Sequence, residues 1–124
     1  MTTGARGEST IQLEDREVRV LFTNRALGDA EQQLGRSIIG VSRGLQDGTS
    51  GIREIVILLR VGMEAARRDA REGGRSITIP DAYDVLEHAG FAIVTEAVMM
   101  AVAAVLSYGT DVQIGDGEDT DPNP

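Results

Sequence analysis

The sequence predicts a mainly α-helical fold with a short N-terminal β-hairpin, an α+β domain of about four to five helices. Apolar residues alternate with polar ones near the N-terminus, which is typical of short strands. From residue 24 onward they recur instead at helical spacing, and glycines separate the helical stretches. The chain has 124 residues, about the length of one domain that buries its own core. We therefore expect one domain over residues 10–108.

The N-terminal stretch predicts a flexible tail followed by the hairpin. Residues 1–9 are small and polar, so we expect a mobile tail, with order beginning near Thr10. Beyond it, apolar residues alternate on both sides of Glu14-Asp15-Arg16-Glu17, which favours two strands joined by a tight turn. The alternating apolar residues are Ile11, Leu13, Val18, Val20 and Phe22.

Two helical stretches are expected after the hairpin. Thr23 or Asn24 can cap the first helix, and apolar residues at helical spacing predict that it covers residues 24–34, up to a glycine. Ser37 begins a second, short helical stretch, which two glycines interrupt before a plain loop over residues 46–51.

The third helix is expected to have one buried face. Thr49 or Ser50 can cap it, and its charged residues fall mainly on the side opposite the apolar stripe. Gly73-Gly74 provides a helix stop after its polar end. The stripe, at i, i+3, i+4, i+7 spacing, consists of Ile52, Ile55, Val56, Leu59, Met63 and Ala66.

Two more helices and a tail complete the chain. Thr78 or Ile79 can cap the fourth helix, and Pro80 suits its first position because the missing N–H costs nothing there. That helix should run to about His88 or Ala89, with a glycine before the last helix, FAIVTEAVMMAVAAVL. Residues 109–124 are rich in Gly, Asp, Thr, Pro and Asn, so we expect a disordered acidic tail.

The apolar run of the last helix is too short for a membrane span. It has 16 residues, whereas a spanning helix needs roughly 20. No Lys or Arg follows Arg75, so no basic loop is present to orient a span. The N-terminus MTTGARGEST has no apolar segment typical of a secretory signal. We expect a cytoplasmic protein.

Glu96 is the single charge in this run. An all-round apolar helix is typically buried on more than one side. The face of Glu96 therefore either opens to water or brings Glu96 to an arginine, because a buried unpaired carboxylate is costly. The candidate arginines are Arg53, Arg60 and Arg67. The residues that share its helix face are Ala92, Met99, Met100 and Ala103.

Composition excludes several classes of function. The 20 acidic and 12 basic residues give a net charge of −8, which disfavours binding to nucleic acids and anionic membranes. The chain has no cysteine, and therefore no disulfide, thiolate metal site or cysteine nucleophile. Aromatic residues make up 3% of the chain, so no stacking platform for bases is expected.

No motif indicates catalysis, a cofactor or a metal. His88 is the only histidine, and one imidazole beside carboxylates is too little for a metal site. The carboxylate pairs Glu14 with Glu17 and Asp81 with Asp84 lie where acidic residues are common in turns and first helical turns. The C-terminal DTDPNP begins with the spacing of a calcium loop but has proline where that loop needs glycine. No phosphate-binding glycine loop is present. We expect a protein that binds rather than reacts.

The order of these elements resembles the small tail assembly chaperones of long-tailed phages and gene transfer agents. The resemblance covers residues 10 to 108. Its most specific parts are Ala26-Leu27, then Glu31 and Leu34-Gly35, and later Thr78-Ile79-Pro80-Asp81. It follows the hairpin through NRALGDAEQQLG, SIIGVSRGL, IREIVILLRVGMEAA and ITIPDAYDVLEHAG to the final apolar helix.

The resemblance implies a non-enzymatic role, without cofactor or metal. A protein of this family coats the tape-measure protein, a long helical chain with apolar faces, and helps tail-tube protein subunits polymerise around it. The expected partners are therefore the tape-measure protein and the tail-tube protein, in the host cytoplasm if the chain is phage-encoded.

A chaperone for a helical client needs an apolar groove and a soluble, negative surface. We expect the third and last helices to supply a groove wall, with Met63, Met99 and Met100 as adaptable contacts. Plain core packing is the alternative for these methionines. The candidate partner-binding residues are Ile55, Leu59, Met63, Val98, Met99 and Val102.

Two alternatives to the chaperone stay open. One is a self-associating structural component of a phage tail or related particle, and the other is a soluble regulator or enzyme. Chains with an apolar helix too broad for one small core often pair or form rings. We therefore also expect a homo-oligomer.

Overall fold

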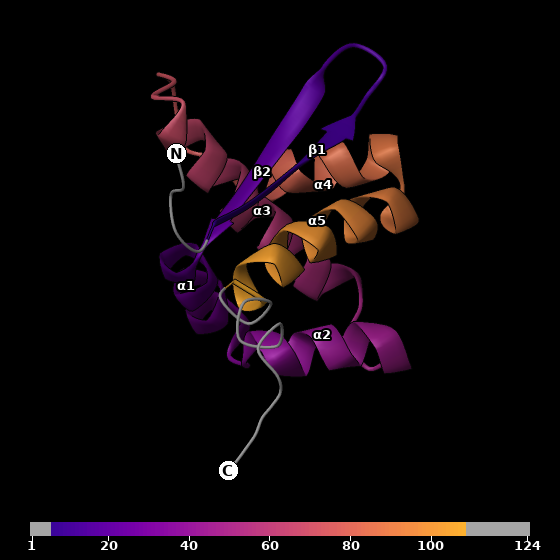
Figure 1. The fold of residues 1–124 in the computed structure, drawn as a ribbon. Coiled ribbons are helices and arrows are strands. Elements are labelled where there is room, and N and C mark those ends of the chain that lie inside the picture. The colour runs from indigo at the N-terminus through magenta and orange to yellow at the C-terminus, as the bar shows by residue number, and fades with distance from the viewer. Residues whose placement is uncertain (1–5, 109–124) are drawn as a thin grey trace.

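The structure, a computed structural model, describes residues 6–108 and confirms the predicted fold class. A two-stranded antiparallel hairpin is followed by five helices (Figure 1). The predicted acidic tail over 109–124 and the first part of the predicted N-terminal tail lie outside the described residues.

The hairpin consists of β1 (Arg6–Gln12) and β2 (Glu17–Thr23). Their register pairs Arg6 with Thr23 and Gln12 with Glu17. The turn between them is closed by the backbone of Leu13, whose N–H donates to the carbonyl of Arg16 at 2.8 Å. The predicted tight turn is therefore confirmed.

The predicted tail over 1–9 ends too late, because β1 already begins at Arg6. Gly7 and Ser9 are small because they face helix α5 (Phe91–Leu106). A Cβ atom on Gly7 would lie 2.0 Å from the carbonyl oxygen of Ala101. The hydroxyl of Ser9 donates to the carbonyl of Ala97 at 2.5 Å. These residues are small to permit a close approach, so composition alone predicted the wrong boundary.

Helix α1 (Asn24–Leu34) has the predicted bounds. Its cap is Thr23, whose hydroxyl accepts from the N–H of Ala26 at 3.1 Å. Gly35 ends it with φ of 70°, a left-handed conformation that glycine adopts without strain.

Helix α2 (Ile38–Asp47) is continuous, so the predicted interruption at its glycines is wrong. Ser37 caps it, with the N–H of Gly40 donating to the hydroxyl at 3.0 Å. A Cβ atom on Gly44 would lie 2.0 Å from Oγ of Ser50. Gly44 therefore leaves room for Ser50 of the following loop to pack against α2, and the helix continues through this glycine.

Helix α3 (Ile52–Asp69) is the longest, with 18 residues. Its N-cap is Gly51 rather than Thr49 or Ser50, and the N–H of Gly51 donates to the carboxylate of Glu54 at 2.9 Å. It ends at Asp69, before the predicted glycine stop. Its last turn is followed by a connecting segment over residues 70–78.

Helix α4 (Ile79–Ala89) begins at a reciprocal cap. The N–H of Asp81 donates to Oγ1 of Thr78 at 3.2 Å, and the N–H of Thr78 donates to the Asp81 carboxylate at 2.8 Å. Pro80 occupies the second helical position, one later than predicted. Gly90, with φ of 93°, then turns the chain by 117° into α5.

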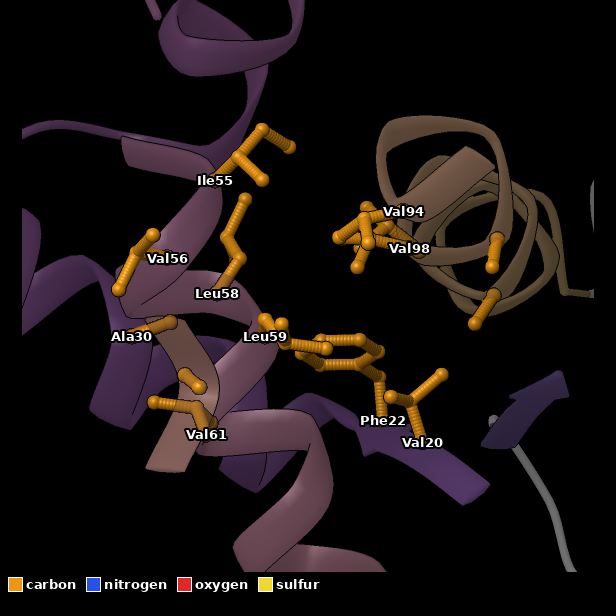
Figure 2. Close-up of a cluster of buried hydrophobic side chains, with 14 of the residues drawn as sticks. Val20, Phe22, Ala30, Ile55, Val56, Leu58, Leu59, Val61, Val94 and Val98 are labelled. Carbon is orange, nitrogen blue, oxygen red and sulfur yellow. The ribbon is translucent and has the colours of Figure 1, made fainter. Parts of the chain in front are cut away.

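The core lies where α3 and α5 meet the hairpin. Figure 2 shows the ring of Phe22, from β2, beside Leu59 of α3 and facing Val94 and Val98 of α5. A Cβ atom on Gly62 of α3 would lie 2.8 Å from this ring, so the glycine lets β2 and α3 approach closely. All four side chains are fully buried. The hairpin therefore supports the two helices from one side.

No single helix within residues 6–108 is long and apolar enough to cross a membrane. Helices α4 and α5 satisfy that test only when taken together, across their 117° bend.

Candidate functional site: the exposed face of helix α5

Helix α5 has one buried and one exposed side. It packs against β1, β2, α3 and α4. Its buried residues all lie on the side that meets these elements; they are Val94, Ala97, Val98, Ala101, Val102 and Val105.

The other side of α5 is apolar and open to solvent. Met100 is 63% exposed, Ile93 is 51% exposed and Leu106 is 45% exposed. Ala92, Glu96, Ala103 and Ala104 are exposed on the same side. We call these seven residues the open face of α5. Exposed large apolar side chains gathered on one side of a helix are a common feature of interaction sites.

The turn at Gly90 explains why this face is free. Because α4 leaves α5 at 117°, the two helices diverge from their junction. In Figure 1, α4 and α5 meet at the right of the view, and α5 runs from there alongside β1. Strand β1 approaches the backbone of α5 closely at Gly7 and Ser9. The covered side is thus fixed by β1 and α3, and the opposite side keeps its apolar residues in water.

Glu96 follows the first of its two expected outcomes, a face that opens to water. Its side chain is exposed, together with Ala92, Met100 and Ala103, and Met99 is partly exposed. Within residues 6–108, no arginine forms an ion pair with it.

Two of the three candidate arginines have other partners. Arg60 donates to the side chain of Gln33 at 2.8 Å and to the carbonyl of Ile77 at 3.3 Å. Arg67 donates to Glu64 at 2.8 Å.

Most of the predicted partner-binding residues lie inside the core. Ile55, Leu59, Val98 and Val102 are fully buried, so they have no surface to offer to a partner in this fold. Met63 and Met99 are partly exposed and border the core. The predicted groove between α3 and α5 is filled, because the hairpin inserts Phe22 between the two helices (Figure 2).

The exposed residues Ile93 and Leu106 were missed by that prediction. In the sequence, the position of Glu96 indicates which side of α5 is open, because Ala92, Met100 and Ala103 share its helix face. A charge marks the side of an apolar helix that stays in water.

Carboxylates elsewhere serve the fold. Glu64 of α3 is 7% exposed and accepts from Arg67 at 2.8 Å, from Arg68 at 2.8 Å and from the N–H of Ile77 at 2.9 Å. These bonds, led by that of Arg67, lower the pKa of Glu64 from 4.5 to about 2. The contact with Ile77 fixes the segment over 70–78 against α3.

A hollow of about 400 Å³ lies beside β2, near that segment. Its charges balance, and Arg75 donates to Asp81 at 2.7 Å, which lowers the pKa of Asp81. His88 lies near Asp84, whose carbonyl is 2.8 Å from Nδ1 and raises the pKa of His88. Among the described residues, no group of His, Asp and Glu is placed to hold a metal ion. The hollow is lined by Arg16, Val18, Met63, Arg67, Glu72, Gly73, Arg75, Ile77, Asp81 and Asp84.

Comparison with known proteins finds no match among family models, curated proteins or solved structures.

Proposed function

We propose that this protein is a tail assembly chaperone of a phage or gene transfer agent, which binds the tape-measure protein and assists polymerisation of the tail-tube protein. The observation that carries the proposal is the open face of α5, where Met100 and Ile93 are more than half exposed. The resemblance of residues 10 to 108 to that family supports it. The role is non-enzymatic, needs no cofactor and belongs to the host cytoplasm.

A helix face of this kind suits a helical client. An amphipathic helix binds by laying its own apolar stripe against an apolar surface at i, i+3, i+4, i+7 spacing. Met100 and the partly exposed Met99 are unbranched and polarizable, so they adapt to irregular stripes along a long client. The net charge of −8 keeps the chaperone soluble while this face is uncovered.

The proposal is tested by co-expression with the neighbouring tail genes and affinity capture of the tagged chain. We expect the tape-measure protein to be captured by the wild type and lost with Met100→Glu, which puts a charge on the open face. Ile39→Glu is the matched control, because Ile39 is 55% exposed on α2. Circular dichroism checks that both variants stay folded.

The presence or absence of the protein in finished particles distinguishes a structural component from a chaperone. A chaperone leaves the tail, so it is absent from purified tails and found with the tape-measure protein in lysates. Failure to capture the tape-measure protein, together with presence in purified tails, refutes the proposal.

The alternative function is a self-associating structural component. The same open face favours it, since a two-fold pair of α5 helices would bury the apolar residues of both copies. Sedimentation at micromolar concentration tests it. An oligomer in the wild type that dissociates with Met100→Glu supports this alternative, and a monomer counts against it.

A further inference from the structure

Glu96 is the only charged residue of α5 and lies within its open face. Ala92, Met100 and Ala103, at i−4, i+4 and i+7 from it, are exposed around it. Glu96 is therefore surrounded by apolar surface on its own helix, while water solvates its carboxylate.

A partner that covers the open face removes water from this carboxylate. Taking an ionised carboxylate out of water is costly unless a cation or several donors replace the water. This chain offers no such cation on α5, because no Lys or Arg follows Arg75. Arg67 and Arg60, two of the arginines on α3, already bind Glu64 and Gln33. Within residues 6–108 no arginine pairs with Glu96, so we expect the partner to supply the replacement.

We propose that the partner of the open face is an amphipathic helix that carries an Arg or Lys within its apolar stripe, opposite Glu96. The inference rests on the proposed function and specifies the chemistry of the client. Charge complementarity favours this occupant over a second copy. The only charged residue on the open face of a second copy is another Glu96, which offers no cation. Two copies of net charge −8 also repel each other. An interfacial charge pair of this kind gives orientation and register as well as affinity.

The test uses three labelled helical peptides of about 20 residues with the same leucine stripe, which carry Arg, Ala or Glu at the central stripe position. Each is titrated by fluorescence anisotropy against the full chain. On the wild type we expect the Arg peptide to bind about five- to tenfold more tightly than the Glu peptide, as a coupled charge pair at a partly desolvated site does. The preference should weaken with added salt.

Charge reversal gives the decisive comparison. With Glu96→Arg the order of the Arg and Glu peptides should invert, and with Glu96→Gln the preference should disappear. Both variants should melt like the wild type, because Glu96 is exposed and forms no ion pair in residues 6–108. Glu87→Arg, a reversal at an exposed carboxylate of α4, is the control for net charge and should keep the wild-type order.

The possible failures are distinct. The three peptides could bind the wild type equally and lose this binding with Met100→Glu. That result would overturn the cation inference and leave the proposed function standing. Binding of no peptide, together with no capture of the tape-measure protein, would overturn both. A wild-type dimer dissociated by Met100→Glu would identify a second copy as the occupant and overturn the cation inference alone.

Discussion

Replacing Glu64 with glutamine should destabilise the fold by about 3 kcal/mol at neutral pH. The pKa of Glu64 is lowered from 4.5 to about 2, first by its hydrogen bonds with Arg67 and also by the N–H of Ile77 and by Arg68. Each unit of pKa difference between folded and unfolded chain corresponds to about 1.36 kcal/mol, so the ionised form contributes roughly 3 kcal/mol. The side chain is 9% exposed, so solvent screening reduces this free energy little.

The sign of the pH dependence follows from the lowered pKa. The contribution is complete above the ordinary pKa of 4.5 and is lost as pH falls toward the folded value of about 2. Urea unfolding of the wild type and Glu64→Gln at pH 7, 5, 4 and 3 measures it. The difference between the two proteins should shrink as pH falls below about 5. A difference that stays constant over this range would refute the reasoning. Glu87→Gln, at an exposed carboxylate, should change stability by less than about 0.5 kcal/mol throughout.

The remaining predictions concern packing, capping and the open face. Gly7→Ala should lower the free energy of unfolding by about 2–3 kcal/mol, because the new Cβ would lie 2.0 Å from the backbone oxygen of Ala101. Its control, Gly28→Ala, has nothing within 4 Å of the new Cβ and should stabilise α1 by about 0.5–1 kcal/mol. Thr78→Ala removes the cap of α4 and should cost about 1 kcal/mol in urea unfolding; an unchanged midpoint would contradict the cap. Met100→Gln should change the melting temperature by no more than a few degrees, since its side chain is 63% exposed; a large loss would show that Met100 belongs to the core.

Local signals predicted the elements because caps and periodicity act within a few residues. Thr23 and Thr78, each one of two residues expected to cap its helix, form bonds of 3.1 and 3.2 Å to their own first turns. Gly90 separates α4 from α5 as expected. The error at the N-terminal boundary occurs where a small residue serves a distant neighbour. Gly7 faces Ala101, and no pattern near Gly7 contains that information.

The candidate site could be predicted only in part. An i, i+3, i+4, i+7 stripe showed that Ile55 and Leu59 lie on one face of α3, but not that the hairpin covers this face. Both are fully buried, and Leu59 lies beside the ring of Phe22 (Figure 2). Residues proposed for a partner are thus part of the core, and Phe22, which packs beside Leu59, lies more than thirty residues away in the chain.

Composition, length and the preceding glycine are local properties, and they were enough to predict that α5 is an apolar helix with one carboxylate. Which side of α5 is covered depends on the elements that pack against it. A helix that is apolar on every side has no periodicity to orient it, so its neighbours choose the buried face. Here β1 and α3 cover the side of Val98, and the 117° turn at Gly90 leaves Glu96 and Met100 in water.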